Sequence, residues 1–247
     1  MEKIAGGLFS RVSFDSGNEM LTTGIALILS VGDAELREKS ARLLHPEEIA
    51  IGQAYASDIR RRSYLHGRIA GKMAIGLVFP DLPGIECVIK TAVFGDPVLS
   101  GISLPYGISI AHSDEWNAGL CFPLTFPMGI DVEKTASKNF HVISSILSNK
   151  EKEICSGASD PNDQVHLLWT AKEAAGKAIR LGFRIPQEWY EIESIETVMN
   201  APVNISFCKF ILLKNLRTIS CPIPGAILSI AYPADKIPDE IMIRLLS

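Results

Sequence analysis

The sequence lacks the features that mark several classes of protein. It has no Cys-x-x-Cys pair, and its five cysteines are scattered, which argues against a disulfide framework and against a zinc site. Its most apolar stretch, residues 24–31, is far shorter than the ~20 residues that span a bilayer, and residues 1–7 lack the apolar run of a signal peptide. The net charge of −4 argues against bulk attraction to nucleic acid. We therefore expect a cytoplasmic protein with reduced thiols that binds neither membranes nor nucleic acid.

The composition is that of an ordinary globular protein. The chain has 247 residues, of which 47% are hydrophobic and 21% charged, and this length suits one large domain or two packed halves. Hydrophobic periodicity and turn signals predict both helices and strands. The predicted helices cover residues 59–78, 139–155 and 163–181; the predicted strands cover residues 24–31, 86–94, 108–111, 118–122, 128–132, 189–198, 203–213 and 226–232. This mixture predicts an α/β (α+β) fold with antiparallel character.

Two helical segments of the chain resemble each other. Residues 65–75 and residues 169–179 share small and basic residues at similar positions, if a slip of one residue is allowed. Such an internal repeat suggests a duplicated fold with a boundary near residue 105, so that residues 1–105 and 106–247 form two similar halves.

An acidic residue precedes each of these segments at the same distance. Glu47 lies 21 residues before Arg68, and Glu151 lies 21 residues before Lys172. The order of a strand, an acidic helix and a basic helix therefore occurs in both halves.

Two short segments place acidic side chains where they can meet. Asp131 and Glu133 are two positions apart on a predicted strand, so both point to the same face. Glu173 and Lys177 are four positions apart on a predicted helix and share a face as well. Carboxylates without histidine or cysteine favour magnesium over zinc. Taken alone, the first pair is better explained by a solvated strand edge and the second by a common helix ion pair.

A basic cluster and a histidine form a second group of candidates. Arg61, Arg68 and Lys72 are seven and four positions apart, so one stripe of a helix can hold them. They could bind a phosphorylated ligand, or they could form a solvated face that pairs with nearby acids. His112 follows a predicted strand beside Ser113, where it could donate to a phosphate oxygen or be a plain surface residue.

Together these segments resemble the 4′-phosphopantetheinyl transferases, specifically the larger type that is built as a pseudo-dimer. The resemblance rests on the Gly-Ile-Asp-x-Glu pattern, the Trp-Thr-x-Lys-Glu-Ala-x-x-Lys pattern, the histidine segment and the arginine stretch. These four motifs are residues 129–133, 169–177, 108–113 and 60–68. The resemblance implies a monomer of two similar α/β halves, with the active site in the cleft between them.

The resemblance also implies an activity. Such enzymes transfer the 4′-phosphopantetheine group of coenzyme A to a serine of an acyl or peptidyl carrier protein, with magnesium, and release adenosine 3′,5′-bisphosphate. The carriers serve fatty acid, polyketide or nonribosomal peptide synthesis. The alternative is a non-catalytic relative that binds coenzyme A or a carrier protein, which Asp96 and Ala111 favour because they depart from the family pattern. An unrelated magnesium-dependent phosphoryl-transfer enzyme is disfavoured, because the sequence has no phosphate-binding loop of the Gly-x-x-x-x-Gly-Lys-Ser/Thr type.

Each candidate residue takes a role under this resemblance. Asp131, Glu133 and Glu173 would hold Mg²⁺ against the pyrophosphate. Lys177 would contact the pyrophosphate, and Glu151 would act as the general base. The residues expected to bind coenzyme A are His112, Ser113, Arg61, Arg68 and Lys72.

Overall fold

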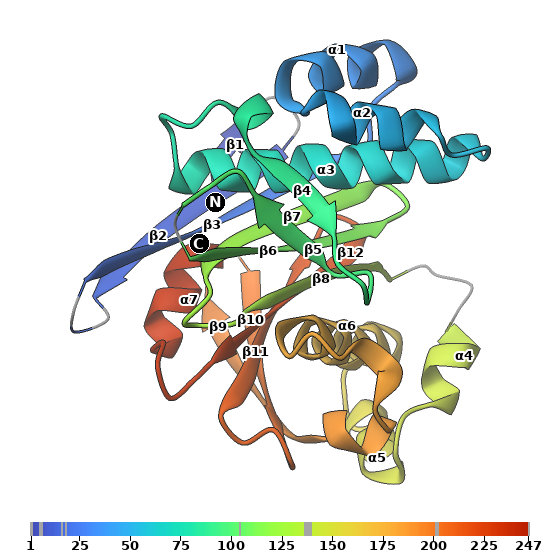
Figure 1. Cartoon of the computed structure of the whole chain (residues 1–247). Helices are drawn as coiled ribbons and strands as arrows, with labels where there is room; N and C mark the ends of the chain where they lie inside the picture. Colours follow the sequence, from blue (N-terminus) through green and yellow to red (C-terminus); the bar gives the residue numbers. More distant parts are fainter. Residues whose placement is uncertain are drawn as a thin grey trace. The chain divides into compact units, whose positions relative to one another are not determined.

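The computed structural model describes residues 2–4, 7–15, 17, 19–103, 105–135, 140–200 and 203–246. The chain divides into two compact units (Figure 1). Unit 1 comprises Met1–Pro127 with Arg244–Ser247, and unit 2 comprises Met128–Ile243. The last helix, α7 (Asp239–Leu246), crosses this division near the end of the chain.

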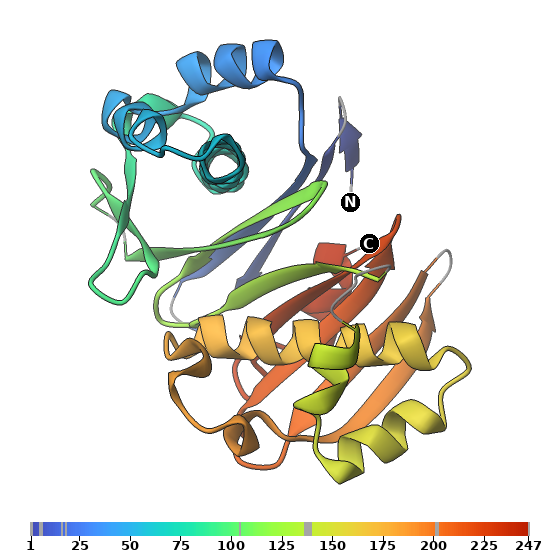
Figure 2. The same ribbon diagram turned by 90° about the vertical axis from the view of Figure 1, so that its right-hand side faces the viewer.

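Unit 1 is a five-stranded antiparallel sheet with helices on one face. Its strands, in spatial order, are β1 (Glu2–Ile4), β2 (Gly7–Asp15), β3 (Met20–Leu29), β7 (Trp116–Pro123) and β6 (Tyr106–Ser113). Its helices are α1 (Asp33–Leu43), α2 (Pro46–Gln53), α3 (Asp58–Val78) and the short η1 (Gly84–Glu86). A separate two-stranded sheet pairs β4 (Val88–Thr91) with β5 (Pro97–Ser100). Figure 2 shows the teal helix α3 end-on, between the sheet and the blue helices α1 and α2.

The sequence of α3 explains its central place. Ser57 caps the N-terminus by accepting from the Arg60 backbone N–H, and residues 65–75 are almost all buried. The predicted helix over residues 59–78 is confirmed, since α3 spans Asp58–Val78. A helix whose side chains are buried on most of its surface is stabilised by the elements that pack around it. The apolar run at residues 24–31 lies largely in β3, where Ile25 and Leu27 are fully buried.

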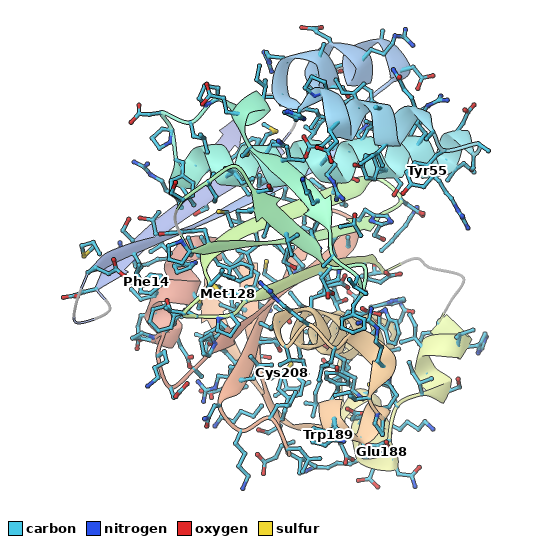
Figure 3. All side chains as sticks on the ribbon, viewed as in Figure 1. Phe14, Tyr55, Met128, Glu188, Trp189 and Cys208 are labelled. Carbon is cyan, nitrogen blue, oxygen red and sulfur yellow. The ribbon has the colours of Figure 1, made fainter. Side chains whose placement is uncertain are left out.

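Unit 2 has a second five-stranded antiparallel sheet. Its strands, in spatial order, are β8 (Gly129–Lys134), β12 (Ala226–Pro233), β11 (Leu216–Ile223), β10 (Val203–Phe210) and β9 (Ile192–Asn200). Its helices are α4 (Phe140–Ser145), α5 (Asn149–Ser156), α6 (Pro161–Ala178) and the short η2 (Gly182–Arg184) and η3 (Gln187–Tyr190). Figure 2 shows α6 lying along one face of this sheet, with α4 and α5 on its other side. The core of the unit includes the fully buried Cys208, labelled in Figure 3.

The mixed α/β architecture with antiparallel sheets is as the sequence predicts, but two boundaries differ. The predicted boundary near residue 105 would place β6 and β7 in the second half, whereas the structure divides the chain between Pro127 and Met128. The reason is pairing, because β7 hydrogen-bonds to β3 and β6 to β7 within one sheet. The predicted helix over residues 139–155 is two helices, because Ser148 caps the start of α5.

Two further expectations concern the state of the cysteines and membrane-spanning helices. All five cysteines are free and buried. None of the described helices combines the length and apolar character that crossing a membrane requires.

Candidate active site

Strand β8 presents its two carboxylates to helix α6. Side chains alternate along a strand, so positions 129, 131 and 133 point to the same face. A Cβ placed on Gly129 would lie 2.2 Å from the carbonyl oxygen of Ala174, so this face of β8 lies directly against α6. Asp131 and Glu133 therefore point to the side of the sheet on which α6 lies.

Helix α6 adds an acid and a base to the same region. The Nζ of Lys177 donates to Oδ1 of Asp131 at 2.7 Å. Burial raises the pKa of Glu173 to about 7, with further increases from the negative charges of Asp131 and Glu133, while Lys177 lowers it. The structure thus brings the three predicted metal ligands and the predicted lysine together between β8 and α6.

The side chains of this group are of the type that binds a divalent cation, but their present positions do not form a metal site. Its donors are carboxylate oxygens, and the repulsion felt by Glu173 indicates more negative charge than Lys177 balances. Among the described residues, no group of three or more His, Cys, Asp or Glu side chains is arranged to hold a metal ion. Side chains of Asp131, Glu133 and Glu173 would therefore have to rotate towards a shared ion.

The predicted general base, Glu151, is enclosed by the protein. It is fully buried in α5 and forms a capping box with Ser148, whose backbone N–H donates to Oε2 at 2.9 Å. Lys172 Nζ donates to the same oxygen at 2.7 Å, and the backbone N–H of Ile192 donates to Oε1 at 2.9 Å. A general base must come within hydrogen-bonding reach of the proton that it accepts. This position argues against Glu151 as the acceptor of a proton from another protein.

A pocket of about 940 Å³ opens in unit 1 beside the first half of α3. Its lining includes Tyr55, which Figure 3 shows beside the N-terminal end of α3. The other polar or charged residues that line it are Ser30, Arg60, Arg62, Ser63, Tyr64, His66, Arg68, His112, Asp114 and Asn117. Three arginines against one aspartate give the pocket an excess of positive charge, which suits an anionic ligand.

Arg68 is the arginine of this pocket with the strongest sign of a missing partner. It is 9% exposed, and its guanidinium lies 4.6 Å from the centre of the Tyr64 ring. One terminal nitrogen donates to Oγ1 of Thr91 at 3.1 Å. Its Nε is buried and has no hydrogen-bond partner among the described residues. A buried guanidinium N–H without a partner is costly, so an anion in the pocket would be favoured.

Two neighbouring basic residues of the pocket, His66 and Arg62, are already engaged within the protein. His66 Nε2 accepts from the Val31 backbone N–H at 2.9 Å, and Nδ1 lies 2.8 Å from the Arg62 carbonyl oxygen. Burial lowers the pKa of His66, so this ring is neutral near pH 7. Arg62 pairs with Asp33 at 3.1 Å. Arg60 is exposed to solvent, so Arg68 is the buried cation of the pocket whose hydrogen bonding is incomplete among the described residues.

The structure brings only part of the predicted basic stripe to the pocket. Arg68 and His112 line it, whereas Arg61, Lys72 and Ser113 are not among the described residues that do so. Arg61 pairs with Asp58 at 2.7 Å. Lys72 is buried and pairs with Glu48 at 2.8 Å, so its ammonium is already engaged inside unit 1.

Sequence reasoning missed several residues of the pocket, among them Arg60, Tyr64 and Asn117. Arg60, Tyr64 and Arg68 line it at spacings of four, so the pocket follows a different helix stripe from the predicted one. Asn117 comes from β7, opposite His112 in the β6–β7 register. The arginine run was a signal for Arg60, but only the neighbouring elements decide which stripe stays open.

Comparisons with known proteins agree with the motifs. Residues 127–217 match the model of the 4′-phosphopantetheinyl transferase superfamily. A stretch of 120 residues is 28% identical to the 4′-phosphopantetheinyl transferase gsp of Aneurinibacillus migulanus, covering 47% of this chain. The alignment spans 48%, or about half, of that relative's length. The family match includes β8 and α6, and both comparisons confirm the resemblance to this superfamily.

Proposed function

We propose that this chain, whose residues 127–217 match the 4′-phosphopantetheinyl transferase superfamily, is itself such an enzyme. It transfers the 4′-phosphopantetheine group of coenzyme A to a serine of an acyl or peptidyl carrier protein and releases adenosine 3′,5′-bisphosphate. The observation that carries the proposal is the group of Asp131, Glu133, Glu173 and Lys177 between β8 and α6, within the matched region.

Magnesium is the metal that this group would hold. Asp131, Glu133 and Glu173 offer the oxygen ligands that Mg²⁺ prefers. When bound, the ion supplies charge neutralisation at the pyrophosphate and orientation of the transferred group. The raised pKa of Glu173 supports this assignment, because a bound cation would offset both the burial and the repulsion from Asp131 and Glu133 that raise it.

Lys177 has a role of its own in the proposed reaction. Its ammonium lies 2.7 Å from Asp131 and is 29% exposed, so it can turn from the carboxylate towards a phosphate oxygen. In that position it would stabilise the negative charge that develops as the phosphate–oxygen bond breaks. It would also keep Asp131 oriented before coenzyme A binds.

The pocket of unit 1 would receive the anionic part of coenzyme A. The Nε of Arg68, which has no hydrogen-bond partner among the described residues, supports binding of a phosphate there, as do the neighbouring Arg60 and His112. Asp96 is not among the described residues that line this pocket, although Gly95 and Pro97 are. Its acidic side chain therefore gives little reason to exclude coenzyme A.

A transfer assay tests the proposal. The protein is incubated with coenzyme A, MgCl₂ and a panel of carrier proteins, and mass spectrometry follows the added phosphopantetheine group. Asp131→Asn should lower the transfer rate by at least ~10²-fold, because it removes a metal ligand and the partner of Lys177. Asp163→Asn, at an exposed site near the start of α6, should leave the rate unchanged.

Calorimetry separates the proposal from its alternative. Binding of coenzyme A without transfer to any carrier would identify a non-catalytic relative. Full activity of the Asp131→Asn protein would show that the group between β8 and α6 is not the active site.

A further inference from the structure

A buried ion pair joins three elements of unit 1. Glu48 is fully buried in α2, where its Oε2 accepts from the His45 backbone N–H at 2.8 Å in a capping box. Lys72 of α3 pairs with the same oxygen at 2.8 Å. The backbone N–H of Ile89, in β4, donates to Oε1 at 2.9 Å. One carboxylate thus connects α2, α3 and β4.

The same arrangement occurs in unit 2. Glu151 of α5 accepts from the capping residue Ser148 at 2.9 Å, from Lys172 of α6 at 2.7 Å and from Ile192 of β9 at 2.9 Å. Its side chain and that of its unit 1 counterpart are both fully buried. In each unit the isoleucine lies 41 residues after the glutamate.

The close contact between strand and helix is also repeated. A Cβ on Gly24 of β3 would lie 3.0 Å from the carbonyl oxygen of Ala74 in α3, as one on Gly129 of β8 would approach Ala174 in α6. Lys72 and Lys172, like Ala74 and Ala174, are 100 residues apart. In the sequence, Glu47 and Arg68 have the spacing of Glu151 and Lys172, but in the structure Glu48 and Lys72 are the counterparts of the unit 2 pair.

Unit 1 lacks the acidic group that accompanies this framework in unit 2. Counted from the equivalent glycines, Ala26 and Ile28 take the positions of Asp131 and Glu133. Counted along the equivalent helices, Met73 takes the position of Glu173, and Leu77 that of Lys177. Unit 1 therefore has the buried Glu48–Lys72 pair without metal-binding side chains at the equivalent positions. In unit 1 this pair cannot serve as a base beside a metal site.

We propose that Glu151 and Lys172 position α6, and with it Glu173, rather than accept the proton of the carrier serine. Glu48 and Lys72 are the counterpart of this pair in unit 1. Glu151 holds α5, α6 and β9 together through its three hydrogen bonds, and Lys172 is adjacent to Glu173 in the chain. The proposal rests on the proposed function, since it assigns a role within the same site.

Two matched variants test the proposal in the full chain. Glu151→Gln and Glu48→Gln each remove one charge from a buried pair, and each should raise the unfolding equilibrium constant at least ~10-fold. Only Glu151→Gln should weaken Mg²⁺ binding, by about 3- to 10-fold in calorimetry, because only its pair lies beside a metal ligand. A purely structural role would leave Mg²⁺ affinity the same in both variants.

The transfer reaction gives the second readout. Folded Glu151→Gln protein should transfer within about 10-fold of the unchanged protein and keep the acid limb of its pH–rate profile. Removal of a general base costs about 10²–10⁴-fold. A loss of 100-fold or more with Mg²⁺ affinity unchanged would overturn the proposal.

A double variant and a separate readout complete the test. If Glu151→Gln does not fold, Glu151→Gln with Lys172→Met removes both charges, and it should restore folding together with measurable transfer. An inactive but folded double variant with full Mg²⁺ affinity would support the base instead. If the unchanged chain transfers nothing to any carrier, the proposed function fails, while the difference in Mg²⁺ affinity between the two glutamate variants still tests the positioning role.

Discussion

Replacing Gly129 with alanine should disrupt the contact between β8 and α6. The added Cβ would lie 2.2 Å from the carbonyl oxygen of Ala174 and 2.5 Å from the backbone nitrogen of Ala178. Carbon–oxygen contacts normally need well over 3 Å, so one backbone must move by about 1 Å. Overpacking of this kind costs about 1–3 kcal/mol, and we expect the upper end because both obstructing atoms are backbone.

Two other glycines provide matched controls for this prediction. In Gly24→Ala the nearest atoms, including the Ala74 carbonyl oxygen, lie 3.0 Å away, so we expect a loss of only about 1 kcal/mol. Gly76 in α3 is exposed and has no atom within 4 Å of an added Cβ. Alanine there should stabilise the protein by about 0.5–1 kcal/mol, because glycine is a poor helix former.

Urea unfolding gives the free energy of unfolding, and hydrogen exchange followed by mass spectrometry reports on each unit separately. Gly129→Ala should accelerate exchange in β8 and α6 and weaken Mg²⁺ binding, since α6 carries Glu173. Equal losses for Gly129→Ala and Gly24→Ala, or a stable Gly129→Ala protein that binds Mg²⁺ normally, would refute the argument from close approach.

The remaining predictions concern charge. The pKa of Glu173, raised to about 7 from 4.5, means that the folded state holds this proton more tightly than the unfolded state, so stability falls as pH rises from about 4.5 to 7. Because Mg²⁺ needs the ionised carboxylate of Glu173, its affinity measured by calorimetry should increase about 10-fold from pH 6 to pH 8. Lys177→Met should move the midpoint of this pH dependence above 7, because Lys177 lowers the pKa of Glu173. An Mg²⁺ affinity that does not change with pH would count against the site. Arg68→Met should weaken binding of adenosine 3′,5′-bisphosphate by about 10- to 100-fold, whereas Arg61→Met should have little effect. A larger loss of affinity in Arg61→Met than in Arg68→Met would place the anion outside the pocket.

Much of the acidic group could be predicted from the sequence because its spacing is local. Alternation along a strand places Asp131 and Glu133 on one face, and the helical repeat places Glu173 and Lys177 on one face. These rules hold wherever the elements lie. What the rules leave open is whether the two faces meet, and the contact at Gly129 decides that.

The roles of buried charged residues could not be predicted in this way. Glu151 looks like part of a solvated helix face in the sequence, and Lys72 looks like part of a basic stripe. Both side chains are buried in ion pairs, because elements distant in the chain cover them. Periodicity tells which residues share a face of a helix but not what packs on that face.

By itself the sequence determined the fold class, the long helices and the two motifs, since each depends on neighbours within one turn or one strand. Only the tertiary structure decided that β6 and β7 complete the sheet of unit 1, that Arg60 rather than Arg61 lines the pocket, and that Glu151 faces Lys172. These outcomes depend on contacts between segments far apart in the chain. A charged side chain that could bind a ligand when exposed forms a structural ion pair when such contacts bury it.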